Sequence, residues 1–440
     1  MRFIGLIVLI TLISYGCARI IQRSEKASVR KLCMILNTVV CIGILFVFKY
    51  FNFFADSFIT MLQGFGLPVS SVTLNILLPV GISFYTFQTL GYVIDVYRGT
   101  VPAERHFGIY AAFVAFFPQI LSGPIPRAGQ LLPQISEPQT FRYEQAAYGL
   151  KQMAWGFFKK MIIADTLAIY TDLVFGNIQA HTGFTLIAAT VMFTFQIYCD
   201  FSGYSDIAIG CAKLFGIDLM TNFSVPYLSG SIKEFWSRWH ISLSTWFRDY
   251  VYIPLGGSRC SRMRHSLNLV ATFAVSGLWH GASWTFVIWG ILHGVGQVVE
   301  NLFTGGKKLK GLKDRITLSA LLRTAAVFCF CAAAWVFFKA SSLQDALHVF
   351  THCLEGITSP VTYLRDGLTV MTLTTDRCID IALMMLTLVI FDCFSLRTDV
   401  IKKIGSFPLA LRWMIYIVFL FFMLYLLPYK AGGEFIYFQF

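Results

Sequence analysis

The chain has 440 residues, of which 56% are hydrophobic and only 13% charged, and its mean hydropathy is +0.66. Soluble domains carry about 25% charged residues, so this composition excludes an ordinary soluble enzyme and predicts an all-α polytopic membrane protein. The net charge of +12 fits an excess of Lys and Arg in cytoplasmic loops, and it would also attract an acidic partner there.

Two apolar stretches come first, residues 3–21 and 33–54. Each is long enough to cross about 30 Å of hydrocarbon as a helix. The first is too long for a cleaved signal peptide, so we expect a retained span. The loop between them is basic, which predicts that it is cytoplasmic and that the N-terminus lies outside. Its basic residues are Arg23, Lys26, Arg30 and Lys31.

A third span is expected at residues 72–92. The next apolar run, 108–126, is short and ends in Ser122-Gly-Pro-Ile-Pro126. Two prolines this close exclude a regular helix. We therefore expect a re-entrant or broken segment, which is tolerated at membrane depth where protein covers it or where it lines a cavity.

Two later runs carry charges. Residues 146–175 are interrupted by Lys159-Lys160, so the first half is expected along the interface and the second half across the membrane. Residues 184–202 return and end near Asp200 and Asp206. These aspartates either line a cavity or mark a helix end at the water boundary.

Residues 218–265 are basic and aromatic, and they contain no run long enough to cross. Their aromatic residues recur at three and four positions, which predicts one apolar helical face. A stripe of this kind usually packs rather than binds a ligand. We expect a cytoplasmic or interfacial helical region here. The stripe consists of Phe235, Trp236, Trp239, Leu243, Trp246 and Phe247.

The remaining apolar runs complete a count of about 10–11 transmembrane helices in a single domain, residues 1–440. Every basic loop then falls on one side, an outer segment covers 340–375, and both ends lie outside. No internal repeat is evident, which argues modestly against an inverted-repeat transporter. These later spans are 266–280, 284–302, 316–339, 379–395 and 410–428.

The most informative stretch is 275–294, VSGLWHGASWTFVIWGILHG. A titratable side chain in so apolar a segment is a functional candidate, and histidine suits proton transfer near neutral pH. His280, with Gly277 and Gly281 beside it, is the predicted catalytic base. The alternative is a histidine held by a backbone carbonyl inside a helix bundle. His293 is expected to pack.

Metal chemistry is not predicted, because no cluster near His280 has the ligand spacing of zinc. His348 and His352, at helical spacing beside Cys353, are the only alternative. His240, in Arg238-Trp239-His240, is either an interfacial histidine or part of a site.

Several long motifs resemble the membrane-bound O-acyltransferase family, and most closely its bacterial branch that contains the alginate O-acetylation membrane subunit. The D-alanyl transfer protein of teichoic acids is a more distant relative. The motifs are FWSRWHISLSTWFRDYVYIPLGG at 235–257, GLWHGASWTFVIWGILHG at 277–294, GISFYTFQTLGYVIDVYRG at 81–99, FFPQILSGPIPR at 116–127, QIYCDFSGYSDIAIG at 196–210 and EFIYFQF at 434–440.

The resemblance implies that His280 is the family's essential histidine and His240 its second characteristic histidine. It also implies a ring of helices, with re-entrant and interfacial pieces, around a central tunnel. Such a tunnel would join thioesters made in the cytosol to a polysaccharide outside.

The sequence therefore predicts a multi-pass protein of the bacterial plasma membrane that transfers an acyl group, expected to be acetyl, to hydroxyls of an exported polysaccharide or to a partner protein. His280 is the expected base, and His240 is expected to bind or orient the donor. Lys233, Arg238 and Arg248 are expected to receive an acidic donor, acetyl-coenzyme A or an acyl carrier protein, as co-substrate.

An extracytoplasmic acyltransferase partner is also expected, whereas a tightly bound cofactor and a nucleic-acid partner are not. The alternative is a transporter or scaffold subunit of an envelope polysaccharide modification complex without chemistry of its own.

Overall fold

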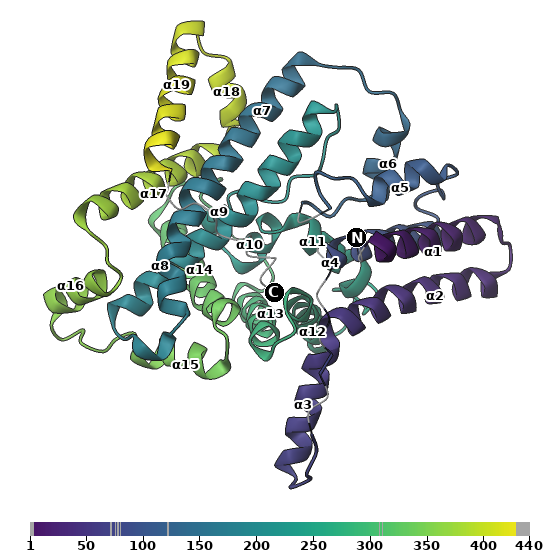
Figure 1. Cartoon of the computed structure of the whole chain (residues 1–440), viewed down its shortest axis with the longest axis horizontal. Coiled ribbons are helices and arrows are strands. Elements are labelled where there is room, and N and C mark those ends of the chain that lie inside the picture. The colour runs from purple at the N-terminus through teal and green to yellow at the C-terminus, as the bar shows by residue number, and fades with distance from the viewer. Residues whose placement is uncertain are drawn as a thin grey trace. The chain divides into compact units, whose positions relative to one another are not determined.

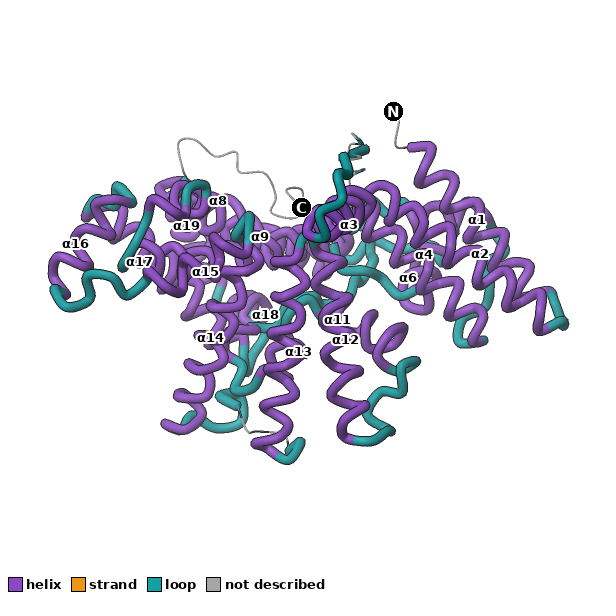
Figure 2. The backbone as a smooth tube through the Cα atoms, turned by 90° about the horizontal axis from the view of Figure 1, so that it is seen from below, coloured by secondary structure: helices purple, strands orange, loops and turns teal. Residues whose placement is uncertain are grey.

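The computed structural model describes residues 4–70, 73, 74, 76, 79, 81–120, 123–307, 309 and 311–427, so the motif EFIYFQF lies outside the described residues. Within these residues every regular element is helical (Figures 1 and 2), as predicted. Seven helices in this part of the chain are long and apolar enough to cross a membrane: Ile4–Arg23, Ala27–Gly64, Phe184–Leu214, Trp284–Thr304, Leu318–Lys339, Thr375–Ser395 and Leu409–Leu426.

The other expected spans fall on shorter or more polar helices. The run at 72–92 corresponds to α4 (Ile82–Arg98), and the run at 266–280 to α12 (Arg262–His280). The first turn of α12 contains two arginines and a histidine, which lowers its hydropathy. The orientation in the membrane and the ring around a tunnel stay predictions.

The chain divides into two compact units. The first comprises residues 1–146, 211–220 and 281–283, and the second comprises 147–210, 221–280 and 284–440. The candidate site residues all belong to the second unit. The single-domain organisation stays a prediction.

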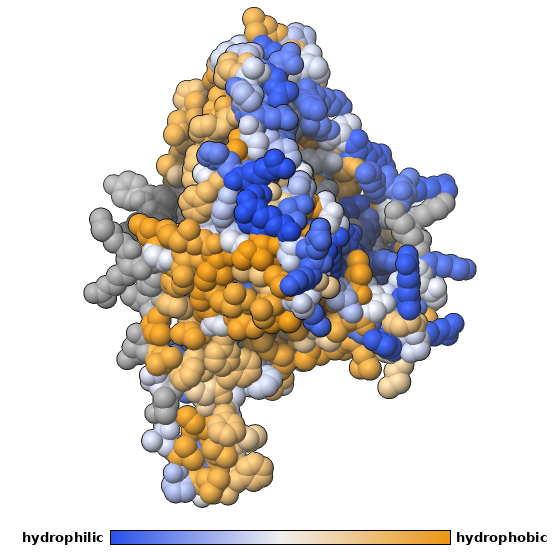
Figure 3. Space-filling view, turned by 90° about the vertical axis from the view of Figure 1, so that its right-hand side faces the viewer, coloured by the Kyte–Doolittle hydropathy of each residue, from blue (hydrophilic) through white to orange (hydrophobic). Residues whose placement is uncertain are grey.

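In the first unit, α1 (Ile4–Arg23) packs against α2 (Ala27–Leu45) and α4, and α1 and α2 lie side by side in Figures 1 and 2. A π-helical segment, η1 (Phe46–Tyr50), joins α2 to α3 (Phe51–Gly64). Figure 3 shows a broad apolar surface bordered by hydrophilic side chains. Exposed apolar side chains of α2 fit contact with lipid: Leu32, Leu36, Val39 and Ile42.

The broken segment predicted at 108–126 is confirmed for its described residues. Helix α5 (Phe107–Val114) ends early, and helical structure resumes only at α6 (Ala128–Ser136). Pro124 and Pro126 lie between them in buried, non-helical chain. Pro118 follows the end of α5 closely and Pro124 and Pro126 precede α6; their missing N–H groups and fixed φ angles oppose a continuous helix across this segment.

In the second unit, α7 (Tyr143–Phe157), the π-helix η2 (Phe158–Ala164) and α8 (Asp165–Phe175) form one helical stretch against α9 (Phe184–Leu214). The backbones touch at small residues: a Cβ on Gly156 would lie 2.7 Å from the Gly203 carbonyl oxygen. This close approach carries buried lysines onto the aspartates of α9.

Lys159 Nζ lies 2.6 Å from Asp206 Oδ2, and Lys160 Nζ lies 2.6 Å from Asp200 Oδ1. Both lysines are therefore largely buried in the helix packing, where each is paired with an aspartate. Because α9 continues to Leu214, neither aspartate marks a helix end.

The basic aromatic region folds into α10 (Ile232–Arg238), α11 (Ile241–Phe247) and the π-helical η5 (Arg248–Tyr252). None is long enough to cross a membrane, and all members of the aromatic stripe are buried, as predicted. The unit is completed by α13 (Trp284–Thr304), α14 (Leu318–Lys339), α15 (Leu343–His352), α16 (Pro360–Val370), α17 (Thr375–Ser395), α18 (Val400–Gly405) and α19 (Leu409–Leu426).

Candidate active site

Helices α12 and α13 lie side by side (Figures 1 and 2) and touch through glycines. A Cβ on Gly277 would lie 2.1 Å from the Phe286 carbonyl oxygen, and a Cβ on Gly290 would lie 2.1 Å from the Phe273 carbonyl oxygen. Any side chain at either position would separate the two backbones. The glycines thus fix the end of α12, where His280 is the last residue.

The structure brings His280 and His240 together, although forty positions separate them in the chain. Their ring centroids are 6.3 Å apart, and the ring planes meet at 79°. His240 is fully buried and His280 is 3% exposed. A small reacting group between two such rings would be shielded from bulk water.

His240 has an unusual backbone. Its φ and ψ of 43° and 53° lie in the left-handed region, which is costly for a non-glycine residue. In this conformation it is the N-cap of α11, and its Nδ1 accepts the Leu243 N–H at 3.3 Å. A neutral imidazole that accepts at Nδ1 carries its proton at Nε2. Burial lowers the His240 pKa to about 3, so at physiological pH its imidazole is neutral and can donate a hydrogen bond through Nε2–H.

Asn222 holds the start of α11, a role that the sequence reasoning missed. Its Oδ1 accepts hydrogen bonds from the Ser242 hydroxyl at 2.9 Å and from the Ser242 N–H at 3.2 Å. Its carbonyl accepts the Ile241 N–H at 2.9 Å. These bonds offset the strained backbone of His240. The signal for Asn222 is tertiary, because nothing in its local sequence marks it.

Aromatic rings surround His280. Its ring centroid lies 4.9 Å from Trp279, 5.1 Å from Trp289 and 5.5 Å from Phe338, all at steep interplanar angles. Such packing restricts the orientations that the imidazole can adopt. His293 is fully buried among aromatic side chains, in agreement with the prediction that it packs.

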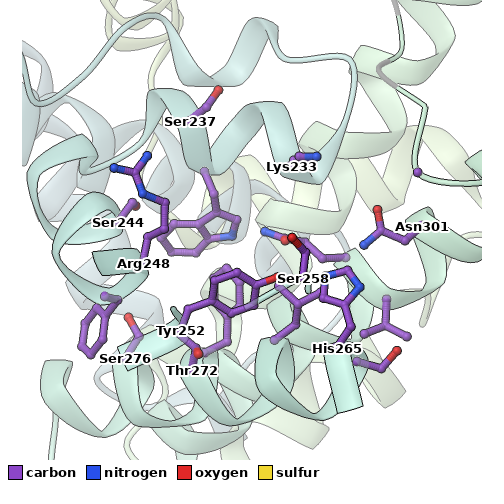
Figure 4. A pocket seen from close by; sticks show the side chains of 18 of the residues that line it. Lys233, Ser237, Ser244, Arg248, Tyr252, Ser258, His265, Thr272, Ser276 and Asn301 are labelled. Carbon is purple, nitrogen blue, oxygen red and sulfur yellow. The ribbon is translucent and has the colours of Figure 1, made fainter. Parts of the chain in front are cut away.

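A pocket of about 840 Å³ lies within the second unit (Figure 4). On α12 it is lined by His265, Leu269, Thr272 and Ser276, a helical face on which His280 is the next position. Ile241, beside His240, also lines it. Neither His240 nor His280 lines the pocket itself, but each lies within one helical turn of a residue that does.

Lys233 and Arg248, two of the residues expected to receive the donor, line this pocket; donor binding stays a prediction. Arg238 does not line the pocket: its guanidinium pairs with Glu234 at 2.6 Å, one helical turn away. The short helix α10 places Lys233 and Arg238 on different faces, and a donor-binding role for Arg238 stays a prediction. Arg248 is 59% exposed and contacts Asp249 at 2.8 Å.

Arg262 and His265 also line the pocket. The sequence analysis had missed His265 and had placed Arg262 only within the basic region 218–265. The described lining of the pocket contains no carboxylate. A basic, carboxylate-free wall suits an anionic ligand. Within the described chain no three His, Cys, Asp or Glu residues are arranged to hold a metal ion. His348 Nε2 instead lies 3.0 Å from the His181 carbonyl oxygen.

Comparisons with known proteins agree with this architecture. The family model described as MBOAT, membrane-bound O-acyltransferase family, matches residues 104–343. The chain is 41% identical to the probable alginate O-acetylase AlgI of Azotobacter vinelandii, over 79% of this chain and 68% of that protein. It is 43% identical to the protein of the same name from Pseudomonas aeruginosa, over 72% of this chain and 59% of that one.

More distant relatives act on other envelope polymers, as their names state. The peptidoglycan O-acetyltransferase of Helicobacter pylori is 34% identical over 79% of this chain and 69% of its own length. The teichoic acid D-alanyltransferase of Streptococcus thermophilus is 34% identical over 56% of this chain and 62% of its own length. The matches thus span roughly three-fifths to two-thirds of these relatives. The chain belongs to the membrane-bound O-acyltransferase family, as a multi-pass acyltransferase of the bacterial cell membrane.

Proposed function

We propose that this protein is an O-acetyltransferase that takes an acyl group from a cytosolic thioester and passes it to a hydroxyl of an exported polysaccharide or of a partner protein. The observation that carries the proposal is the buried pair of His240 and His280 next to a basic pocket, whose lining includes Ile241 and Ser276, one helical turn before His280. The polymers named for the relatives, alginate and peptidoglycan, support a polysaccharide as the final acceptor.

His280 acts as the general base. It removes the proton from the acceptor hydroxyl as the oxygen attacks the thioester carbonyl carbon, and the C–S bond then breaks. The proton passes from His280 to the leaving thiolate, so the reaction consumes none. Proton transfer of this kind contributes about 10²–10⁴-fold to the rate.

His240 acts as a hydrogen-bond donor to the carbonyl oxygen of the thioester. Its Nδ1 is occupied by the Leu243 N–H, so its Nε2–H is the group available to stabilise negative charge on that oxygen. Donors of this type contribute about 10²–10³-fold. The two histidines therefore have different roles, set by their environments.

The pocket receives the donor. Lys233 and Arg248, together with Arg262 and His265, offer positive charge to the phosphates of acetyl-coenzyme A or of an acyl carrier protein. A volume of about 840 Å³ is in the range of small-molecule and cofactor sites, about 300–1,000 Å³. An extracytoplasmic partner would complete transfer to the polymer.

Labelled acetyl followed in cells tests the proposal. Wild type, His280→Ala, His240→Ala and His240→Asn are compared at matched membrane levels, and label is counted on the surface polymer and on membrane partners. We expect both alanine variants to lose label. His240→Asn should retain part of it, because asparagine tolerates the left-handed conformation, caps a helix and still offers an N–H.

Unchanged label in a folded His280→Ala protein would remove the base from the mechanism. It would favour the alternative, a transporter or scaffold subunit of a polysaccharide modification complex. Loss of label in His240→Asn equal to that in His240→Ala would contradict the donor role of His240.

A further inference from the structure

Trp236 and Trp289, here called the aromatic wall, link the pocket lining to His280 through successive ring contacts. Trp236 lines the pocket and is nevertheless 7% exposed. Its ring centroid lies 5.8 Å from that of Trp289, which in turn lies 5.1 Å from His280. The two indoles thus fill space beside His280 in which the carbons of a long acyl chain could otherwise pack.

His293 holds Trp236 in this position. The indole N–H of Trp236 donates to His293 Nδ1 at 3.2 Å, and the two ring planes meet at 89°. An indole nitrogen only donates, so His293 must accept with an unprotonated Nδ1. Because both residues are buried, rotating the indole away would leave its N–H without a partner, which is unfavourable.

The support behind the wall is rigid. Trp289 and His293 lie one turn apart on α13, and α13 contacts α12 through backbone. A Cβ on Gly294 would lie 2.8 Å from the Cα of Val270, so α13 has no free space toward α12. The ring of Phe235 stacks on His293 with an interplanar angle of 4°. The wall therefore has little freedom to recede.

We propose that Trp236, fixed by His293, determines acyl-chain length: it restricts the donor to short acyl thioesters. Trp236 is the specificity-determining residue and His293 is its positioning residue. This inference rests on the proposed function, since it concerns the donor of that reaction. Without such a wall, each methylene buried in an apolar pocket would tighten binding about fourfold, and longer donors would be favoured.

The test uses the purified full chain in detergent micelles or nanodiscs. Binding of thioether analogues of acyl-coenzyme A with two-, four- and six-carbon acyl groups is measured, together with transfer from the corresponding thioesters. Binding is informative even where transfer needs a partner protein. The readout is the ratio of six-carbon to two-carbon affinity, which a general loss of packing would leave unchanged.

We expect Trp236→Ala to raise this ratio about tenfold or more. His293→Leu should raise it less, whereas His293→Asn, whose amide oxygen can accept the indole N–H, should restore the wild-type ratio. Trp335→Phe is the matched control. Trp335 belongs to the same buried cluster, and its indole N–H donates to the Tyr227 hydroxyl at 3.1 Å. It does not line the pocket, so the affinity ratio of the Trp335→Phe variant should equal that of wild type.

An unchanged ratio in a folded Trp236→Ala protein, or an equal shift in Trp335→Phe, would overturn the inference. If Trp236→Ala does not fold, the same ratio is measured in Trp236→Leu, a smaller truncation, and in His293→Leu and His293→Asn, with the same expected directions. A wild-type protein that neither binds the analogues nor transfers acyl groups would instead refute the proposed function. Binding without chain-length selectivity would defeat only the present inference.

Discussion

Replacing Gly277 by alanine adds a single methyl group at the point where α12 meets α13. That Cβ would lie 2.1 Å from the Phe286 carbonyl oxygen and 3.3 Å from the Cα of Gly290. The obstacle is backbone and cannot rotate aside. Ordinary van der Waals contact begins at 3.4 Å, so the two helices must separate by roughly 1 Å.

Two magnitudes follow from this displacement. Overpacking of this kind costs about 1–3 kcal/mol of stability. His280 lies three residues further along α12, at the end that must shift, and misplacing a catalytic group by about 1 Å lowers the rate about 10²-fold. We therefore expect Gly277→Ala to lose most acetyl transfer at temperatures where the protein is still folded.

The assay combines thermal unfolding of the solubilised protein with acetyl labelling. Gly16→Ala in α1 is the matched control, because a Cβ there meets no atom within 4 Å. It should be neutral or should stabilise by about 0.4–1 kcal/mol. Gly290→Ala should resemble Gly277→Ala, and the double variant should lose less than the sum, because one separation accommodates both methyl groups.

Full activity and an unchanged unfolding temperature in Gly277→Ala would refute the reasoning. Additive losses in the double variant would show that the two glycines do not share one contact.

Three further predictions concern charge. Lys160→Ala should lower the free energy of unfolding by about 3–5 kcal/mol, because it removes the ammonium group that pairs with the buried Asp200. Lys213→Ala breaks a pair with the 58%-exposed Asp218 and should lower it by under about 1 kcal/mol; thermal unfolding compares the two variants. Arg248→Gln should raise the KM for the thioester donor about fivefold with little change in kcat, since its side chain is largely exposed, and higher salt should shrink the difference. Because the folded pKa of His240 is about 3, below the value of about 6.5 in an unfolded chain, the unfolded state alone binds this proton between these values. Stability should therefore fall as pH decreases below 6.5, by up to about 1.4 kcal/mol per pH unit, and His240→Asn should flatten that fall; equal pH profiles for both proteins would contradict it.

The sequence was sufficient for the helical class, the membrane location and the family, because each depends on local information. Long apolar runs and basic loops mark spans without knowledge of their neighbours. The prolines at 124 and 126 break a helix wherever they are placed. His280 was also identifiable, because a titratable residue in an apolar segment is costly in any fold.

Charged side chains inside helices were harder to interpret. Lys159 and Lys160 suggested a boundary with water, and Asp200 and Asp206 suggested a cavity or a helix end. The structure pairs the lysines with the aspartates and continues α9 past both aspartates, so the helix-end reading is wrong, while the cavity lining stays a prediction. The partner of a buried charge comes from another helix, and its position depends on how the two helices cross.

The sequence by itself thus identified which residues are candidates for chemistry, while the tertiary structure decided which of them lie together. It placed His240 beside His280, put Arg248 on the pocket and paired Arg238 with Glu234. It also placed Asn222 against the start of α11 and Trp236 on the pocket, positions that have no local signature. The physical reason is that residue type sets intrinsic reactivity, whereas proximity arises only when helices pack, here through glycines that allow α12 and α13 to touch.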